Sequence, residues 1–405
     1  MTESNNDSFG GIDWATDEHA VCVVDTAGKL QDEFIVPHTD CGLRDLCRRL
    51  ARNSVRRVAI ERPDGPVVDT LMEAGFEVVV VVSRSVKAFR QRYTTSGSKS
   101  DRSDAFVLAD CLRSDGHRWA SLQPDTPATV TLRAHVRARR DLVKARVSVT
   151  NQLRAHLQLY FPAAVGLFAD LDGKISRKFL RRFPTENEAG WLTEKRLANW
   201  LRSAGYNNKR SAEDLFDHLK RAPIGVTGPE ATARATITLA YIDVIDTLTE
   251  KIKELEAQMK RLLDEHPDAH IFRSLPRCGT VRAATMLAEI GDCRARFPDA
   301  NSLACLAGVT PSTRASGRHR SVTFRWAANT SLRNVLCSFA GDSRKGNEWA
   351  AHRYNQLRAE GKRHPHAERI MARTWTQIIW RCWQDHQPYD PSRHGALQAL
   401  RQTKP

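Results

Sequence analysis

Two aspartates stand one helical turn apart in the stretch KSDRSDAFVLAD, which runs from Lys99 to Asp110. Asp101 and Asp104 precede an apolar run, so we expect a helix to begin there, and residues three apart share one face of a helix. Carboxylates on one face repel each other, and a cation removes this penalty. Mg²⁺ prefers carboxylate oxygens and keeps coordination positions for substrate phosphates. The pair therefore indicates part of a metal site, whereas a single aspartate at a helix start more often serves as a cap.

Two further acids fall at the ends of expected strands. Asp13 lies near the end of FGGIDW, and Glu61 ends RRVAIE. Because strand ends at one edge of a sheet can point to the same place as a helix start, we expect all four acids to converge on Mg²⁺ or Mn²⁺. Two such ions about 3.5–4 Å apart can activate a nucleophile and stabilise the leaving oxygen in phosphoryl transfer.

The first hundred residues alternate between strand and helix patterns. Three short strands joined by short turns predict an antiparallel meander, at 9–14, 20–25 and 32–37. Leucines spaced by three and four predict a helix over 42–52. A strand at 56–61, a helix at 67–75, a strand at 76–82 and the helix from 101 complete the order.

The strand FEVVVVV is continuously β-branched after its first two residues, which is typical of the middle of a sheet covered on both faces. The element order and the positions of the acids together resemble the RNase H-like fold, specifically its RuvC-like branch with a D-E-D-D set. This resemblance implies a mixed α/β domain with the acids at one edge of the sheet.

The composition favours a polyanionic partner and a reducing compartment. The net charge is +15, and clustered Lys and Arg bind phosphate by releasing counterions, although solubility alone is a simpler explanation. Nine scattered cysteines without a C-x-x-C pair argue against a zinc ribbon and a disulfide scaffold. Without an apolar run of about 20 residues or a signal peptide, we expect a cytoplasmic protein with no membrane association.

The middle of the chain is helical and basic. A helix pattern from Thr131 to Tyr160 carries seven Lys and Arg against one acid, Asp141, so we expect it to contact phosphates, the alternative being a solvated face. Its nucleic-acid-binding candidates are Arg137, Arg140 and Lys144. Beyond an inserted helical module at about 162–230, apolar residues spaced by three and four predict a coiled coil with the basic helix or with another chain: Ile245, Leu248, Ile252, Leu255, Met259 and Leu262.

The C-terminal third contains a helix–turn–helix pattern and a serine among cations. SLPRCGTVRAATMLAEIGD, from Ser274 to Asp292, resembles a helix-hairpin-helix in which Arg277 and Gly279 contact phosphate, although a plain αα-hairpin is the alternative. Ser316 precedes Gly317 in a basic segment, where a serine could attack a phosphate held by guanidinium groups. Ser312 and Ser321 are alternative nucleophiles, and the surrounding cations are Arg314, Arg318, His319 and Arg320.

Five stretches in this order resemble the insertion-sequence DEDD transposases related to the Piv DNA invertase, which are bridge-RNA-guided serine recombinases. They are GGIDW, VAIE, KSDRSDAFVLAD, SLPRCGTVRAATMLAEIGD and LAGVTPSTRASG. The resemblance implies that Asp13, Glu61, Asp101 and Asp104 bind metal and that Ser316 forms a phosphoserine link to DNA.

The same resemblance implies the partners. They would be donor and target DNA, a structured noncoding bridge RNA that selects the DNA by base pairing, and further copies of the chain in a dimer or tetramer. The acidic domain of one subunit would meet the serine domain of another, and the protein would be associated with the nucleoid. Two other functions stay open: a RuvC-like metal-dependent junction nuclease without a serine nucleophile, and a non-catalytic RNA/DNA scaffold.

The predicted fold class is α/β plus α. A RuvC-like metal-binding domain would occupy residues 1–125, followed by a helical and coiled-coil region at 126–268. A C-terminal transposase domain at 269–395 would carry the helix-hairpin-helix-like element and the serine, and a tail would follow at 396–405.

Overall fold

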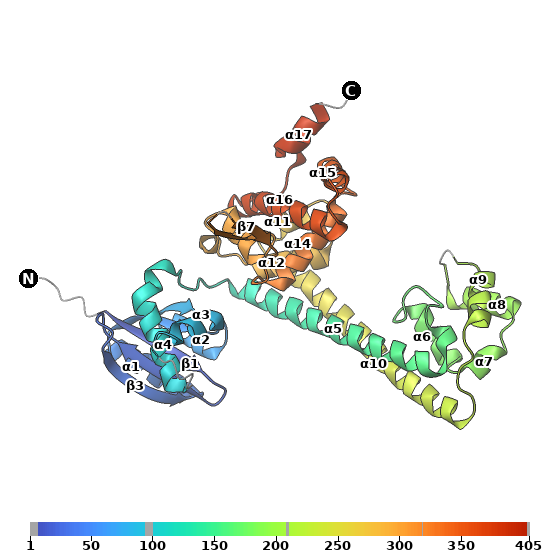
Figure 1. Cartoon of the computed structure of the whole chain (residues 1–405), viewed down its shortest axis with the longest axis horizontal. Helices are drawn as coiled ribbons and strands as arrows, with labels where there is room; N and C mark the ends of the chain where they lie inside the picture. The colour runs from blue at the N-terminus through green and yellow to red at the C-terminus, as the bar shows by residue number, and fades with distance from the viewer. Residues whose placement is uncertain (1–6, 94–99, 208–209, 318, 403–405) are drawn as a thin grey trace, which may run out of the picture. The chain divides into compact units, whose positions relative to one another are not determined.

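The computed structural model describes residues 7–93, 100–207, 210–317 and 319–402. The chain divides into two compact units, Met1–Pro124 and Asp125–Pro405 (Figure 1). The predicted regions 126–268 and 269–395 both lie in the second unit. Along the described residues, no helix combines the length and the apolarity that a membrane crossing requires.

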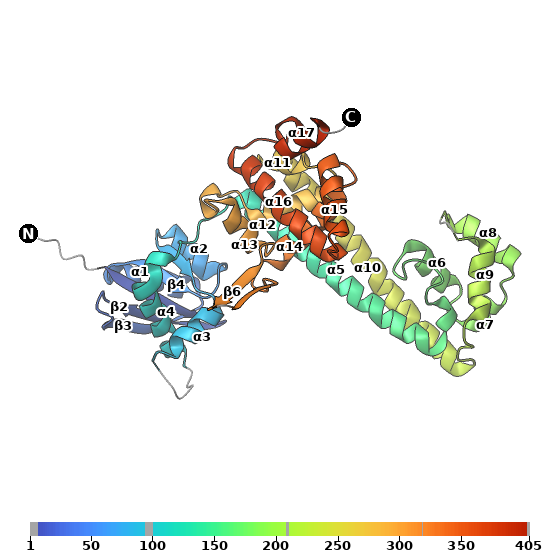
Figure 2. The same ribbon diagram turned by 45° about the horizontal axis from the view of Figure 1, so that its top comes forward.

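The first unit is built on a five-stranded mixed sheet (Figure 2). The strand order is β3-β2-β1-β4-β5; β1, β2 and β3 form the predicted antiparallel meander, and β4 and β5 run parallel to β1. The mixed α/β class is confirmed, whereas the RuvC-like assignment stays a prediction. The strands are β1 (Ser8–Trp14), β2 (Glu18–Val24), β3 (Leu30–Pro37), β4 (Val55–Ile60) and β5 (Glu77–Val80).

Helices cover both faces of this sheet. The leucines of α1 and the apolar side of α2 pack on one face, and α3 and α4 pack on the other. The helix α3 was not predicted; within it, Val86 is the single fully buried residue, so its sequence shows little apolar periodicity. The helices are α1 (Asp40–Arg52), α2 (Pro66–Glu73), α3 (Ser83–Arg90), α4 (Asp101–Asp115) and the 3₁₀ turn η1 (Gly116–Arg118).

The expectation that Phe76–Val82 forms a strand in the middle of the sheet is wrong. β5 is shorter and lies at the edge of the sheet. The open edge of β5 nevertheless has a backbone partner, because the N–H of Leu122 donates to the carbonyl of Val78 at 2.6 Å. A continuous β-branched run reports that both faces of a strand are buried. It does not report the position of the strand in the sheet.

The second unit contains two long helices that pack along each other, α5 (Pro127–Tyr160) and α10 (Pro229–Glu265) (Figure 1). They run antiparallel, since Arg139 bonds Glu256 and His156 contacts the carbonyl of Arg234. Of the predicted heptad, Ile245, Ile252 and Met259 are buried and the other three residues are partly buried. The partner of α10 is thus the basic helix of the same chain, and a regular coiled-coil geometry stays a prediction.

The inserted segment is a small helical module at one end of this helix pair. Its aromatic and leucine side chains share a core with Leu153 and Leu157 of α5 and with Ile242 and Ile245 of α10. The insert is therefore anchored to the two long helices rather than tethered by a linker. Its elements are η2 (Pro162–Ala164), α6 (Lys174–Arg182), α7 (Glu186–Gly190), α8 (Glu194–Ala204) and α9 (Ala212–Arg221).

The C-terminal region is helical apart from a two-stranded hairpin that was not predicted. Trp375 and Trp383 are fully buried and belong to the core of this region. The helices are α11 (Ala269–Arg273), α12 (Thr280–Ile290), α13 (Ala300–Leu306), α14 (Thr330–Ser343), α15 (Glu348–Ala359), α16 (His364–Gln384) and α17 (Gly395–Gln402), with turns η3 (Arg294–Arg296) and η4 (Pro391–Arg393) and strands β6 (Ser312–Ser316) and β7 (His319–Thr323).

A buried histidine makes the first unit sensitive to acid. His19 on β2 is fully buried, with its Nε2 2.8 Å from Nδ1 of His38. Burial and the neighbouring His38 lower the pKa of His19 to about 4. The unfolded chain therefore binds more protons, and the stability from neutral His19, up to about 3 kcal/mol, is complete above about pH 6.5 and lost as pH falls towards 4.

We expect His19→Gln to cost less stability at pH 5 than at pH 7, because the variant no longer contains the group that must be charged on unfolding. Urea unfolding of the wild type and the variant at both pH values measures this. A difference between the two proteins that stays constant across the range would contradict the assignment.

Candidate functional site

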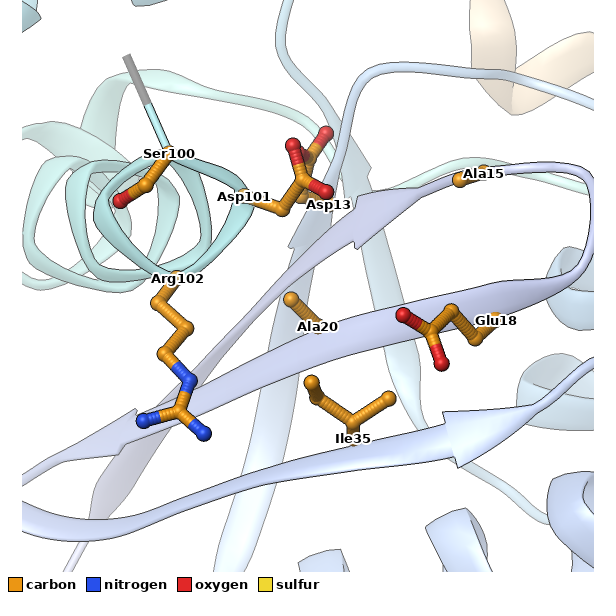
Figure 3. Close-up of a pocket in the computed structure, with 8 residues that line it drawn as sticks. All are labelled: Asp13, Ala15, Glu18, Ala20, Ile35, Ser100, Asp101 and Arg102. Atoms are coloured by element: carbon orange, nitrogen blue, oxygen red, sulfur yellow. The ribbon is translucent and has the colours of Figure 1, made fainter. Parts of the chain in front are cut away.

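The acids Asp13 and Asp101 meet at one pocket of the first unit. Asp13 is the penultimate residue of β1, and Asp101 is the first residue of α4. Both line a pocket of about 250 Å³, and Figure 3 shows them at this pocket, Asp13 from the strand and Asp101 from the start of the helix. The structure thus brings two of the four predicted acids to one pocket, which Glu61 and Asp104 do not line, and metal binding by any of the four stays a prediction.

Local structure explains how the two acids are brought together. Gly11 of β1 lies so close to α4 that a Cβ there would be 2.2 Å from the carbonyl oxygen of Ala105. Glycine therefore lets the helix pack directly on the strand that carries Asp13. Ser100 is the N-cap of α4 and accepts from the N–H of Ser103 at 3.2 Å. The cap is thus a serine, which leaves the Asp101 carboxylate facing the pocket.

The other two predicted acids are held by α3. Asp104 is almost fully buried, and Nε of Arg90 donates to its Oδ1 at 2.7 Å. Glu61 follows β4, whose last residue, Ile60, pairs with Ile12 of β1, and it accepts from the hydroxyl of Ser83 at 2.7 Å. The first and last residues of α3 thus bind two acids of the set. Among the described residues, no group of three or more His, Cys, Asp or Glu side chains is arranged to hold a metal ion. Convergence of all four acids on one ion stays a prediction.

Removing Arg90 should destabilise the first unit. Arg90→Ala leaves the buried Asp104 carboxylate without its counter-charge, and loss of one partner of such a pair costs about 3 kcal/mol. The control is Arg92→Ala, because Arg92 is 55% exposed and 3.9 Å from Asp115; an exposed pair contributes at most about 1 kcal/mol. Urea unfolding should separate the two variants, and equal small effects would show that Asp104 does not depend on Arg90.

Sequence reasoning missed a third acid at the pocket. Glu18 of β2 lines it together with Asp13 and Asp101 (Figure 3). Ala20 pairs with Asp13 across the two strands, and residues two apart on a strand share a face. The sequence could have revealed Glu18, because it lies two residues before Ala20 and so on the same face of the strand. It was missed because the strand was expected to begin at residue 20.

Ser316 is exposed on the hairpin formed by β6 and β7, which stands out from the helices of the second unit (Figure 2). It lies opposite His319, and Arg314 lies opposite Ser321. Since directly opposite residues share a face, Arg314, Ser316 and His319 lie on one side of the hairpin.

The other cations predicted near Ser316 differ in position. Arg320 pairs with Ala315, so it lies on the opposite face of the hairpin from Ser316. Arg318 lies outside the described residues. Gly317 has a φ of +55°, a left-handed value that suits glycine in a tight turn. The Ser-Gly pair therefore sits at a strand end beside a turn rather than in an open loop.

The basic face of α5 is partly neutralised by acids from elsewhere in the chain. Arg137 lies 3.4 Å from the buried Glu289, and Arg140 and Lys144 both pair with Asp141. The local excess of positive charge is smaller after folding than in the sequence, because acids outside α5 pair with three further arginines: Arg133 with Asp125, Arg139 with Glu256 and Arg146 with Asp172. Phosphate binding by Arg137, Arg140 and Lys144 stays a prediction.

The turn before α12 is exposed. Gly279 is the N-cap of α12 and forms no side-chain cap bond, and Arg277 before it adopts a left-handed φ of 61°. The preceding helix α11 has five residues, so the helical pair is short. Contact of Arg277 and Gly279 with phosphate stays a prediction.

Known proteins match the chain on both sides of the insert. A transposase family model matches residues 10–162, and the model of the transposase IS116/IS110/IS902 family matches residues 269–355. The mini-circle putative transposase for IS117 of Streptomyces coelicolor is 31% identical over 412 residues, covering 98% of this chain and 100% of the relative.

Two further relatives agree. The insertion element IS110 uncharacterized 43.6 kDa protein of Streptomyces coelicolor is 26% identical over 94% of this chain and 95% of its own length. The putative transposase y4uE of Sinorhizobium fredii is 34% identical over 50% of this chain and 58% of its own length. With one relative above 30% identity along almost the whole chain, and with transposase family models matching on both sides of the insert, the chain belongs to the IS116/IS110/IS902 family of transposases.

Proposed function

We propose that the protein is a DNA recombinase of an insertion sequence, which cuts and rejoins donor and target DNA through a phosphoserine at Ser316. The observation that carries this proposal is the exposed face of the hairpin in a transposase-family chain. On this face Ser316 lies opposite His319 and two residues from Arg314. A guanidinium group can donate two hydrogen bonds to one phosphate, so Arg314 is suited to bind the scissile phosphate.

The proposed chemistry balances without an external energy source. In the first step Oγ of Ser316 forms a bond to phosphorus, one P–O bond of the DNA backbone breaks, and the released oxygen takes a proton to become a hydroxyl. In the second step a hydroxyl of another DNA end attacks the phosphoserine and releases the serine. Each step exchanges one phosphate ester for another. His319, opposite Ser316, carries a ring nitrogen that can accept the serine proton.

Carboxylate oxygens at the pocket suit a hard divalent cation. Asp13 and Asp101 would hold Mg²⁺ or Mn²⁺, and Glu61 and Asp104 would join them if α3 released its contacts. A bound ion would supply positive charge to the phosphate and to the leaving oxygen. The acids and Ser316 belong to different units of the chain, so we propose that subunits of a dimer or tetramer combine them on DNA.

A bridge RNA would select the DNA sites in this proposal. Its support is the net charge of +15 together with the absence from the sequence of a recognisable base-reading motif. Base pairing would then read the sequence, and the protein would contact the phosphate backbone. Such a complex would work in the cytoplasm at the nucleoid.

The test is to purify the full-length protein with its co-purifying RNA and to add donor and target DNA with Mg²⁺. Quenching with denaturant and digesting the protein should yield a DNA-linked peptide that contains Ser316, identified by mass spectrometry, and sequencing should find one structured RNA. Cleaved DNA without any covalent adduct would instead favour the metal-dependent junction nuclease, for which the pocket of Asp13 and Asp101 is the supporting observation.

A further inference from the structure

A basic groove lies between α6 of the inserted module and α10, outside every site described above. The hollow measures about 590 Å³. The helix α6 contributes four cations at positions i, i+3, i+4 and i+7, which form one stripe along a helix. Five cations and two acids line the groove: Lys174, Arg177, Lys178, Arg181, Lys253, Asp246 and Glu250. Figure 1 shows α6 beside the part of α10 that carries the insert.

The arginines of the groove have a structural role. Arg181 bonds Asp243 and Asp246 at 2.6 Å each, and Arg177 pairs with Asp246. The side chain of Arg177 is 13% exposed, and its Nε has no hydrogen-bond partner among the described residues. These pairs fasten α6 to α10 and fix the floor of the groove.

The lysines of the groove have no comparable structural role. Lys174 and Lys178 are exposed and form no ion pair in the described part of the chain, and Lys178 donates only to the carbonyl of Ala204 at 3.2 Å. Lys253 is 65% exposed and lies 3.3 Å from Glu250. The ammonium groups of Lys174 and Lys178 are therefore available to an external anion, and that of Lys253 is held only by an exposed pair with Glu250, which is weak.

Positive charge is more concentrated in this groove than in the inserted module as a whole. Residues 162–230 carry 12 Lys and Arg against 9 Asp and Glu, so the module as a whole is close to neutral. The groove lining has five cations against two acids, and since Asp243 and Asp246 pair with the two arginines, the excess of positive charge comes from the three lysines. Solubility alone does not require positive charges to be concentrated in a groove. In a groove these charges create a stronger local positive potential, which attracts anions.

We propose that this groove binds the phosphodiester backbone of a nucleic-acid strand and gives the insert a role in holding nucleic acid. Lysine ammonium groups contact phosphates as point charges, so the binding would not depend on base sequence. The proposal goes beyond the recombination chemistry, because it concerns binding alone and does not depend on which residue is the nucleophile.

The test compares two triple variants of the full-length protein that remove the same charge. The groove variant is Lys174→Ala with Lys178→Ala and Lys253→Ala. The control is Lys195→Ala with Lys220→Ala and Lys251→Ala, because these lysines are exposed on the insert or on α10 and do not line the groove. Thermal unfolding of both variants should match the wild type, since all six side chains are exposed.

Binding is measured with a duplex DNA and with a structured RNA hairpin over a range of salt concentrations. We expect the groove variant to lose about tenfold in affinity and the slope of log K against log salt to fall in magnitude by about 2–3, as for three lost phosphate contacts. Replacing the same three lysines with arginine should restore binding. A selective loss with either probe supports the proposal and identifies which nucleic acid occupies the groove.

The result that overturns the proposal is equal behaviour of the two variants with both probes, whether both retain binding or both lose it to the same extent. Both variants can be assayed for the Ser316 adduct separately. Failure of the groove assignment and failure of the serine assignment therefore give different results.

Discussion

A Ser316→Ala variant is expected to form no covalent adduct with DNA and to lose strand exchange by about three orders of magnitude or more. Alanine removes the one oxygen that would attack phosphorus. Ser316 is exposed at the end of β6, and the hydrogen bonds that build the hairpin come from the backbone, so the fold should be retained. DNA binding by the variant should therefore match the wild type in the same assay.

The hairpin supplies matched controls for this experiment. Ser312 and Ser321 lie on the same face as Ser316, since Ser312 is four residues earlier on β6 and Ser321 is opposite Arg314. Ser312→Ala and Ser321→Ala should each retain the adduct and strand exchange. An adduct that persists in Ser316→Ala and disappears in one of the other two variants would move the nucleophile to that serine.

An Asp101→Asn variant is expected to lose metal-dependent cleavage and strand exchange by about a hundredfold or more, because the change removes a charge that would hold the proposed divalent cation at the pocket. Asparagine keeps the size of the side chain. The N-cap of α4 is Ser100, so helix formation does not depend on the lost carboxylate. The rise in melting temperature on adding Mg²⁺ or Mn²⁺, which reports binding to the native state, should also disappear.

The control is Asp69→Asn on α2, which removes the same charge at an exposed position away from the pocket. It should retain both activity and the metal-induced rise in melting temperature. Ser316→Ala and Asp101→Asn together distinguish the recombinase from the two alternative functions. A junction nuclease would be inactive with Asp101→Asn and active with Ser316→Ala, whereas a scaffold would keep its function with both. Full stabilisation of Asp101→Asn by the metal would show that Asp101 is not a ligand.

The local elements of the first unit were predictable because each follows from short-range patterns. The leucine spacing of α1, the turns between β1, β2 and β3, and the polar start of α4 were all visible in the sequence. Asp13 and Asp101 could be paired because one ends a strand and the other begins a helix on the same sheet. Helix α3 was missed, since a helix with one fully buried residue has almost no apolar period.

The hairpin of β6 and β7 was missed for a related reason. Apart from partly buried Ser312 and Ser321, its described residues are exposed. Because neither face of the hairpin packs on a core, its sequence does not show the apolar–polar alternation that predicts a strand. The charge of α5 was overestimated because its acidic partners, such as Glu256 and Glu289, are more than a hundred residues away in the sequence.

The sequence alone determined the order of the strands and helices of the first unit apart from α3, the family, and the candidate acids and serine, because these depend on residue types and on spacings within one element. Only the tertiary structure decided that β5 lies at the edge, that α3 binds Glu61 and Asp104, that Glu18 joins the pocket, and that Ser316 shares a face with Arg314 and His319. The physical reason is that each of these facts is a contact or a pairing between two segments. The residues of one segment do not determine which other segment it will meet in the folded chain.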